Sequence, residues 1–231
     1  MKTLRPSDPS PAAQSYAGFY PVIAPLIMCS GLGDGKTTAC VMAQAATIDA
    51  LRKGLTLDKP TDDMECACRL LRRMAINAND ASWWASDIER TDTMRPLIPL
   101  LLDSVGSPEV TARRIYRFVD CHVREIYPQV TELAWPGKYT AECAFLRALT
   151  PITDQASAGK AAKDIRASDL LDLLDLLGIL GILDRLGILG RLGRLDRLDR
   201  LDRLGRLDRL GRQKCRATYL NLFRELAAIK Y

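Results

Sequence analysis

Residues 107–128, SPEVTARRIYRFVDCHVREIYP, carry the clearest secondary-structure signal in the chain. Ser107, Pro108 and Glu109 supply an N-cap residue, a proline at the first helical position and an acid in the first turn, which is the order that starts a helix. Apolar side chains then recur at helical spacing along one face, namely at Ile115, Phe118, Val119, Val123 and Ile126. This stretch predicts an amphipathic helix that ends before Pro128, because proline removes an amide donor and crowds the preceding turn.

The segments that precede this helix show helical patterns as well. Residues 38–54 are rich in alanine and end on two cations and a glycine, a typical helix C-terminus. Asp62 with Glu65, and Ser86 with Glu89, have the spacing of capping boxes at the starts of two further helices.

This part of the sequence contains prolines that interrupt a helix but no pattern typical of a strand. Pro96 and Pro99 predict a kinked or divided helix before residue 107. Between residues 38 and 150 the sequence contains no β-branched, alternating segment of the kind that forms strands. The sequence therefore predicts an all-α fold, an irregular helical bundle.

The domain organisation follows from changes in composition along the chain. A low-complexity Leu/Gly/Asp/Arg triplet repeat runs from Leu171 to Arg212, and its pattern indicates that it arose by tandem duplication of a short stretch of coding DNA. Three residues advance an α-helix by about 300°, so the leucines drift around the helix and build no lasting apolar face. We expect a flexible N-terminal arm, a helical domain, a linker, the repeat and a C-terminal helix, at residues 1–18, 19–150, 151–169, 170–212 and 213–231.

Charge and cysteine content restrict the classes of function. The net charge is +5, and the part from Asp184 to Arg212 alone contributes nine arginines and five aspartates. Contact of nucleic acid with this arginine-rich repeat is an alternative, but we expect no such partner because most of the aspartates stand beside arginines. Seven cysteines in an odd, scattered set favour reduced thiols in the cytoplasm over a secreted disulfide framework. Because no apolar run is long enough to span a bilayer, we expect no membrane association.

The stretch SGLGDGKTTAC, residues 30–40, raises the question of a nucleotide site. Gly35, Lys36 and Thr37 match the end of the phosphate-loop pattern Gly-x-x-x-x-Gly-Lys-Ser/Thr, but Ser30 stands at the first glycine position. Asp103 offers the acid that would hold Mg²⁺ in such a site. A degenerate nucleotide-binding loop is therefore one interpretation.

The competing interpretation is a plain turn in front of a helix. Its glycines would form the turn, and Asp34 or Thr37 would cap the helix that follows. A phosphate-loop fold needs several parallel strands, whereas residues 38–100 predict helices, so we favour the turn and expect no cofactor.

Other residue types suggest metal or catalytic sites only weakly. Cys66 with Cys68, and Cys121 with His122, are metal ligands in kind, but there is no second pair at zinc-site spacing. His122 is the sole histidine and has no nucleophile at a spacing that suggests catalysis. We therefore expect buried thiols, a buried histidine, no metal and no catalytic residue.

Two sets of side chains are candidates for contact with a protein partner. Trp83 and Trp84 lie in a short link between helices, where adjacent indoles either anchor a partner or divide between the core and its cover. Arg113, Arg117 and Arg124 form a stripe opposite the apolar face of the 107–128 helix, which is either a partner surface or a solvated face.

The order of four segments resembles a group of small helical proteins encoded in bacterial and phage genomes. These segments are CVMAQAATIDALRKG, TDDMECACRLLRRMAINAND, RPLIPLLLDS and the long arginine-rich helix, over residues 36–128. The resemblance implies a helical fold and carries no activity. Taken together, the sequence predicts a non-enzymatic interaction or accessory protein, with a degenerate nucleotide-binding protein as the alternative.

Overall fold

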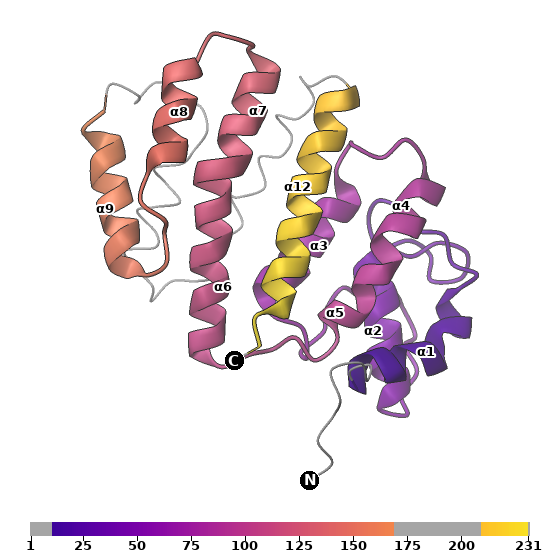
Figure 1. Cartoon of the computed structure of the whole chain (residues 1–231). Coiled ribbons are helices and arrows are strands. Elements are labelled where there is room, and N and C mark those ends of the chain that lie inside the picture. The colour runs from indigo at the N-terminus through magenta and orange to yellow at the C-terminus, as the bar shows by residue number, and fades with distance from the viewer. Residues whose placement is uncertain (1–10, 169–208, 231) are drawn as a thin grey trace. The chain divides into compact units, whose positions relative to one another are not determined.

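The computed structural model describes residues 11–168 and 209–230 (Figure 1). Helices account for nearly all of its regular structure. They are α1 Pro11–Ile23, α2 Val41–Arg52, α3 Arg69–Asp80, α4 Asp87–Met94, the 3₁₀ turn η1 Arg95–Leu97, α5 Ile98–Leu101, α6 Pro108–Cys121, the π-helical turn η2 His122–Ile126, α7 Tyr127–Ala134, α8 Thr140–Ala148, α9 Gln155–Arg166 and α12 Arg209–Ala228.

The predicted all-α class is confirmed. Within the described ranges there is no β-strand, and only two isolated bridges pair Ile27 with Thr38 and Gly33 with Ala39. None of the helices described is both long and apolar enough to cross a bilayer.

The chain divides into two compact units, residues Met1–Val105 and Gly106–Tyr231. The boundary falls inside residues 19–150, for which the sequence predicts one helical domain. Because the boundary residues directly precede the N-cap Ser107, the second unit begins with the helix that the opening sequence stretch encodes.

Helix α2 is the centre of the first unit. It packs against α1, α3 and α5. Most of its residues are buried, including Val41, Met42 and Ile48 together with several alanines. A helix that is apolar around most of its circumference is stable only when other helices cover it, and alanine lets them approach closely.

The N-terminal part of the first unit is more ordered than the sequence predicts. Residues 11–18, expected within a flexible arm, belong to α1, and residues 1–10 of that arm lie outside the described part. The buried side chains of Ile23 and Leu26 attach this region to the core. Arg95 also bonds the carbonyl groups of Ala24 and Leu26, which fixes the chain directly after α1.

Helix starts were predicted with mixed success. Ser86 caps α4 through the Glu89 amide, and Ser107 caps α6 with Pro108 at the first position, so both of these predictions are confirmed. Pro96 and Pro99 divide the segment into α4, η1 and α5, also as predicted.

The prediction that Asp62 and Glu65 form a capping box is wrong, because α3 begins only at Arg69. A residue distant in sequence holds the start of this helix, since the amide of Cys68 donates to Ser104 Oγ at 2.9 Å.

In the second unit, the helix beginning at Pro108 does not end before Pro128. It continues through η2 into α7, with Pro128 near the start of α7. In the π-helical turn the Tyr127 amide bonds to the carbonyl of His122, five residues back. The wider turn relieves the crowding that proline causes in a regular α-helix, so the helix passes the proline.

Two further helices of the second unit pack on this long helix. α8 packs on η2 and α7, and α12 packs on α6, η2 and α7 (Figure 1). The predicted linker 151–169 is a further correction, because residues Gln155–Arg166 form α9 with a capping box between Asp154 and Ser157. The predicted triplet repeat lies outside the described residues except for 209–212, which open α12.

Helix α7 contains a buried polar defect. The side chain of Thr131 is fully buried, and its hydroxyl finds no hydrogen-bond partner among the described residues. A buried hydroxyl without a partner costs free energy that a methyl group of the same shape does not.

Thr131→Val is therefore expected to raise the free energy of unfolding by about 1 kcal/mol. Thr91→Val is the matched control, because the Thr91 hydroxyl accepts from the Met28 amide and donates to the Asp87 carbonyl. Urea denaturation of both variants checks the prediction: the first should gain stability and the second should lose it. A loss in both would contradict it.

Candidate interaction site

The glycine loop around Asp34 is organised by a carboxylate. Asp34 Oδ1 accepts hydrogen bonds from the backbone amides of Lys36, Thr37 and Thr38 at 2.9, 2.9 and 2.8 Å, and the Thr37 hydroxyl donates to Oδ2. These donors hold the pKa of Asp34 far below its usual range, the Thr38 amide having the largest effect. The glycines allow the close turn: Gly33 has φ +77°, and a Cβ there would lie 2.4 Å from the Thr38 carbonyl oxygen.

This geometry bears directly on the candidate phosphate residues Gly35, Lys36 and Thr37. In a phosphate loop, consecutive backbone amides converge on an anion. Here the amides of residues 36–38 converge on the chain's own carboxylate, so Asp34 takes the place that a phosphate oxygen would need. Asp103, the candidate Mg²⁺ ligand, forms an ion pair with Arg52 at 2.7 Å.

A nucleotide test follows from this arrangement. Mg-ATP or Mg-GTP is expected to leave the melting temperature of the full chain unchanged, because the amides of the loop are already bonded. A ligand at about 100 times its dissociation constant would otherwise add about 2.7 kcal/mol of stability. Differential scanning fluorimetry measures the shift, with Lys36→Ala in parallel. A rise in the wild type that Lys36→Ala abolishes would restore the nucleotide-binding interpretation.

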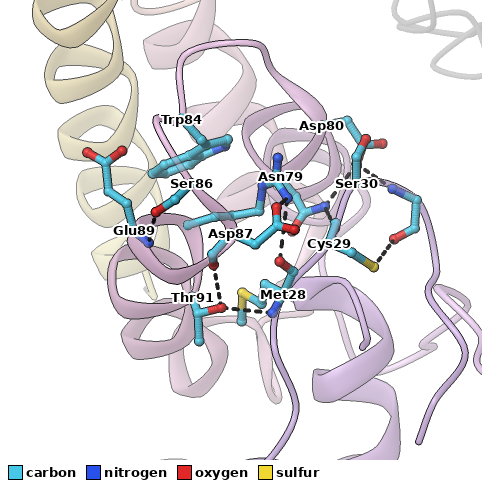
Figure 2. A network of polar contacts seen from close by, with 12 residues as sticks. Met28, Cys29, Ser30, Asn79, Asp80, Trp84, Ser86, Asp87, Glu89 and Thr91 are labelled. Carbon is cyan, nitrogen blue, oxygen red and sulfur yellow. Dashed lines mark hydrogen bonds and ion pairs between the residues drawn. The ribbon is translucent and has the colours of Figure 1, made fainter. Parts of the chain in front are cut away.

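The ends of the same loop are fastened by Asn79 and Asp80, the last residues of α3 (Figure 2). Asn79 donates to the Cys29 carbonyl at 2.7 Å and accepts from the Val41 amide at 3.4 Å. Asp80 accepts from the Gly31 amide at 3.0 Å. This network joins the loop, the start of α2 and the end of α3, so its polar groups serve the fold.

The two tryptophans divide between the core and its edge. The Trp83 side chain is buried, whereas Trp84 is half-buried. Both indole N–H groups donate to the carbonyl of Ala78, at 3.2 and 2.8 Å, and the rings meet edge to face. Of the two alternatives left open by the sequence, this arrangement matches a core residue and its cover, and Trp84 is the one that reaches the surface.

The arginine stripe on α6 and η2 is engaged within the second unit. Arg117 forms a two-pronged ion pair with Glu225 of α12, at 2.6 and 3.0 Å, and also bonds Asp120 and Glu125. Arg124 bonds Asp120 as well. Arg113 is exposed. Two of the three candidate partner residues therefore bind the chain itself.

Sequence reasoning missed the neighbouring Arg114. Its side chain is only 2% exposed, and its guanidinium donates to the carbonyls of Leu226 at 2.9 Å and Ile229 at 2.7 Å. A cation is favourable at these carbonyls, because the C-terminal end of a helix carries partial negative charge. Position 114 lies beside the apolar stripe, and this was the only sequence signal that Arg114 is buried. The carbonyls that Arg114 bonds lie more than a hundred residues away in sequence.

The remaining reactive side chains are in protected surroundings. His122 is buried against the rings of Phe118, Tyr127 and Tyr219, and burial lowers its pKa to about 4. Burial also raises the pKa of the Cys121 thiol to about 12, so the thiol stays protonated. No group of three or more metal-ligating side chains comes together in the part of the chain that the structure describes.

Apolar exposure distinguishes the first unit. Within the described ranges, the large apolar side chains that are exposed all belong to this unit: Tyr20, Val22, Ile27, Leu32, Leu55, Leu57, Ile88 and Val105. Ile88, on α4 close to Trp84 in sequence, has the highest exposed fraction of these at 65%. The sequence did not single it out, because which face of α4 turns inward depends on packing.

Comparison with known proteins adds no relative: no protein-family model, no curated protein and no solved structure matches the chain.

Proposed function

We propose that the chain is a non-enzymatic interaction protein whose first unit binds a protein partner through exposed apolar side chains. The observation that carries the proposal is the concentration of these side chains, from Tyr20 to Val105, in one of the two units. A folded chain gains by burying such side chains, and clusters of them are typical of surfaces that bind other proteins.

The chemistry of the titratable groups supports binding over catalysis. Asp34 bonds the backbone of its own loop, Asp103 holds Arg52, and His122 is enclosed by aromatic rings. Carboxylates and imidazoles are the groups that act in acid–base catalysis, and these three are engaged with or enclosed by the chain itself. All seven cysteines are free thiols, which supports a cytoplasmic setting as part of the proposal.

Affinity capture with matched variants tests the proposal. The full chain is immobilised and exposed to an extract of the cells that express it, beside Val22→Ser, Leu55→Ser and Ile88→Ser. Arg113→Ala is the control on the second unit. We expect a protein that the wild type and Arg113→Ala retain and that at least one serine variant loses.

The melting temperature of each variant must match that of the wild type, so that lost capture reports lost contact. Two results would overturn the proposal: no protein retained by the wild type, or a protein that Arg113→Ala alone loses. The second result would move the binding surface to the second unit.

A further inference from the structure

The start of α4 presents an apolar side chain to solvent in a fixed position. The Ser86 hydroxyl accepts from the Glu89 amide at 3.1 Å, and Glu89 Oε2 accepts from the Ala85 amide at 2.7 Å. These bonds set the first turn of the helix. Thr91 and Met94, further along the helix, are buried, whereas Ile88 in the first turn is 65% exposed.

Trp84 adds a second, rigid apolar group four residues before Ile88 in the chain. Its indole N–H is bonded to the Ala78 carbonyl at 2.8 Å, so the ring is fixed while part of it remains exposed. Figure 2 shows Trp84 beside Ser86 and Glu89, above the start of α4. Rigid aromatic groups lose little conformational freedom on binding, which makes them effective anchors at interfaces.

Acidic side chains are frequent in the sequence around these two apolar groups. Residues 79–92 contain four carboxylates, and three of them are exposed, on Asp80, Asp87 and Asp92. The same stretch contains one basic residue, Arg90, which is paired with Asp87. We call Trp84, Asp87, Ile88 and Asp92, which lie on α4 or just before it, the α4 edge.

The negative charge of the α4 edge favours one class of binding partner over others. Exposed carboxylates repel the phosphates of nucleic acids and of anionic lipids, and they attract ammonium and guanidinium groups. A protein segment with an apolar side chain between lysines or arginines matches both the apolar side chains and the carboxylates of this edge.

Building on the proposed function, we propose that the α4 edge is the partner-binding surface and that its partner is a basic, amphipathic protein segment. The apolar residue of that segment covers Ile88 and Trp84, while its cations pair with Asp87 and Asp92. The chain as a whole carries a net charge of +5, so it has no general attraction for cations, and a preference for a basic segment has to come from a local surface.

Two peptides of equal apolar content test this inference on the full chain. One is an amphipathic peptide built only from leucine and lysine, labelled with a fluorophore. The other has glutamate in place of every lysine. We expect fluorescence anisotropy to show at least about tenfold tighter binding of the lysine peptide, a difference that shrinks as salt is added.

Variants locate the binding surface. Ile88→Ser and Asp92→Lys are each expected to weaken binding of the lysine peptide about fivefold or more. Leu55→Ser is the matched control, because Leu55 is comparably exposed on the same unit but follows α2. It should leave binding unchanged.

Equal affinity for the two peptides, or an equal loss in Leu55→Ser and Ile88→Ser, would overturn the inference. Such a failure is separate from failure of the proposed function. A captured partner that depends on another exposed apolar residue, or that binds through an acidic segment, would keep the interaction function and reject the α4 edge as a site for basic segments.

Discussion

Replacing Arg114 by methionine is expected to lower the free energy of unfolding of the second unit by about 3 kcal/mol. The buried guanidinium donates to the carbonyls of Leu226 and Ile229 at the end of α12, and methionine fills much of the same volume without any donor. Hydrogen bonds from a charged group contribute about 1.5–3 kcal/mol each, and part of this is offset because methionine has no charge to desolvate.

The adjacent residue supplies the control. Arg113→Met makes the same chemical change one position earlier at an exposed site, and it should alter stability by no more than about 0.5 kcal/mol. Hydrogen exchange of the α12 amides reports on this helix without interference from the first unit. If both variants lose protection equally, or if neither does, the contact between Arg114 and α12 does not have the importance that its burial indicates.

Acid is expected to destabilise the second unit through His122. Burial lowers the pKa of this imidazole to about 4 in the folded chain, against about 6.5 when it is exposed to water. Below pH 6.5 the unfolded chain therefore takes up a proton that the folded chain does not. Stability falls by up to about 1.4 kcal/mol for each pH unit until the folded pKa is reached, a total of about 3 kcal/mol.

His122→Phe isolates this contribution. Phenylalanine keeps the aromatic contacts with Phe118, Tyr127 and Tyr219 and cannot be protonated. All other groups are the same in the two proteins, so the informative quantity is the difference between the stability curves of the wild type and His122→Phe from pH 7 to pH 4. Urea denaturation followed by circular dichroism gives these curves. Parallel curves would show that the buried ring is not the source of the acid sensitivity.

Local signals in the sequence predicted much of the helical framework. The caps at Ser86 and Ser107 and the breaks at Pro96 and Pro99 depend on residues within one or two turns, so they could be seen in advance. Helix α9 was missed although its capping residues Asp154 and Ser157 are local, because the alanines and glycine around them suggested a linker.

Features that depend on distant parts of the chain could not be predicted in this way. The start of α3 is set by Ser104, and the role of Arg114 is set by Leu226 and Ile229. The passage of the helix beyond Pro128 required a π-helical turn that leaves no recognisable sequence pattern.

The candidate site shows the same division. A pair of tryptophans suggested a core residue and its cover, but not which ring would be exposed. The exposure of Ile88 depends on which residues of the rest of the chain cover the first turn of α4, and the local sequence does not contain that information. For the glycine loop, the sequence indicated the turn and proposed Asp34 or Thr37 as the cap of the next helix. In the structure Cys40 caps α2, and Asp34 bonds the amides of its own loop.

The contact between Arg114 and α12 also has a consequence for biosynthesis. Leu226 follows Arg114 by 112 residues. A ribosome adds roughly 5–20 residues each second, so this interval lasts on the order of ten seconds. During that time α6 and its Arg114 have been translated, but α12, which supplies the carbonyl partners of this arginine, has not. The second unit can therefore bury Arg114 against α12 only after α12 has been synthesised, so its fold is completed late in translation.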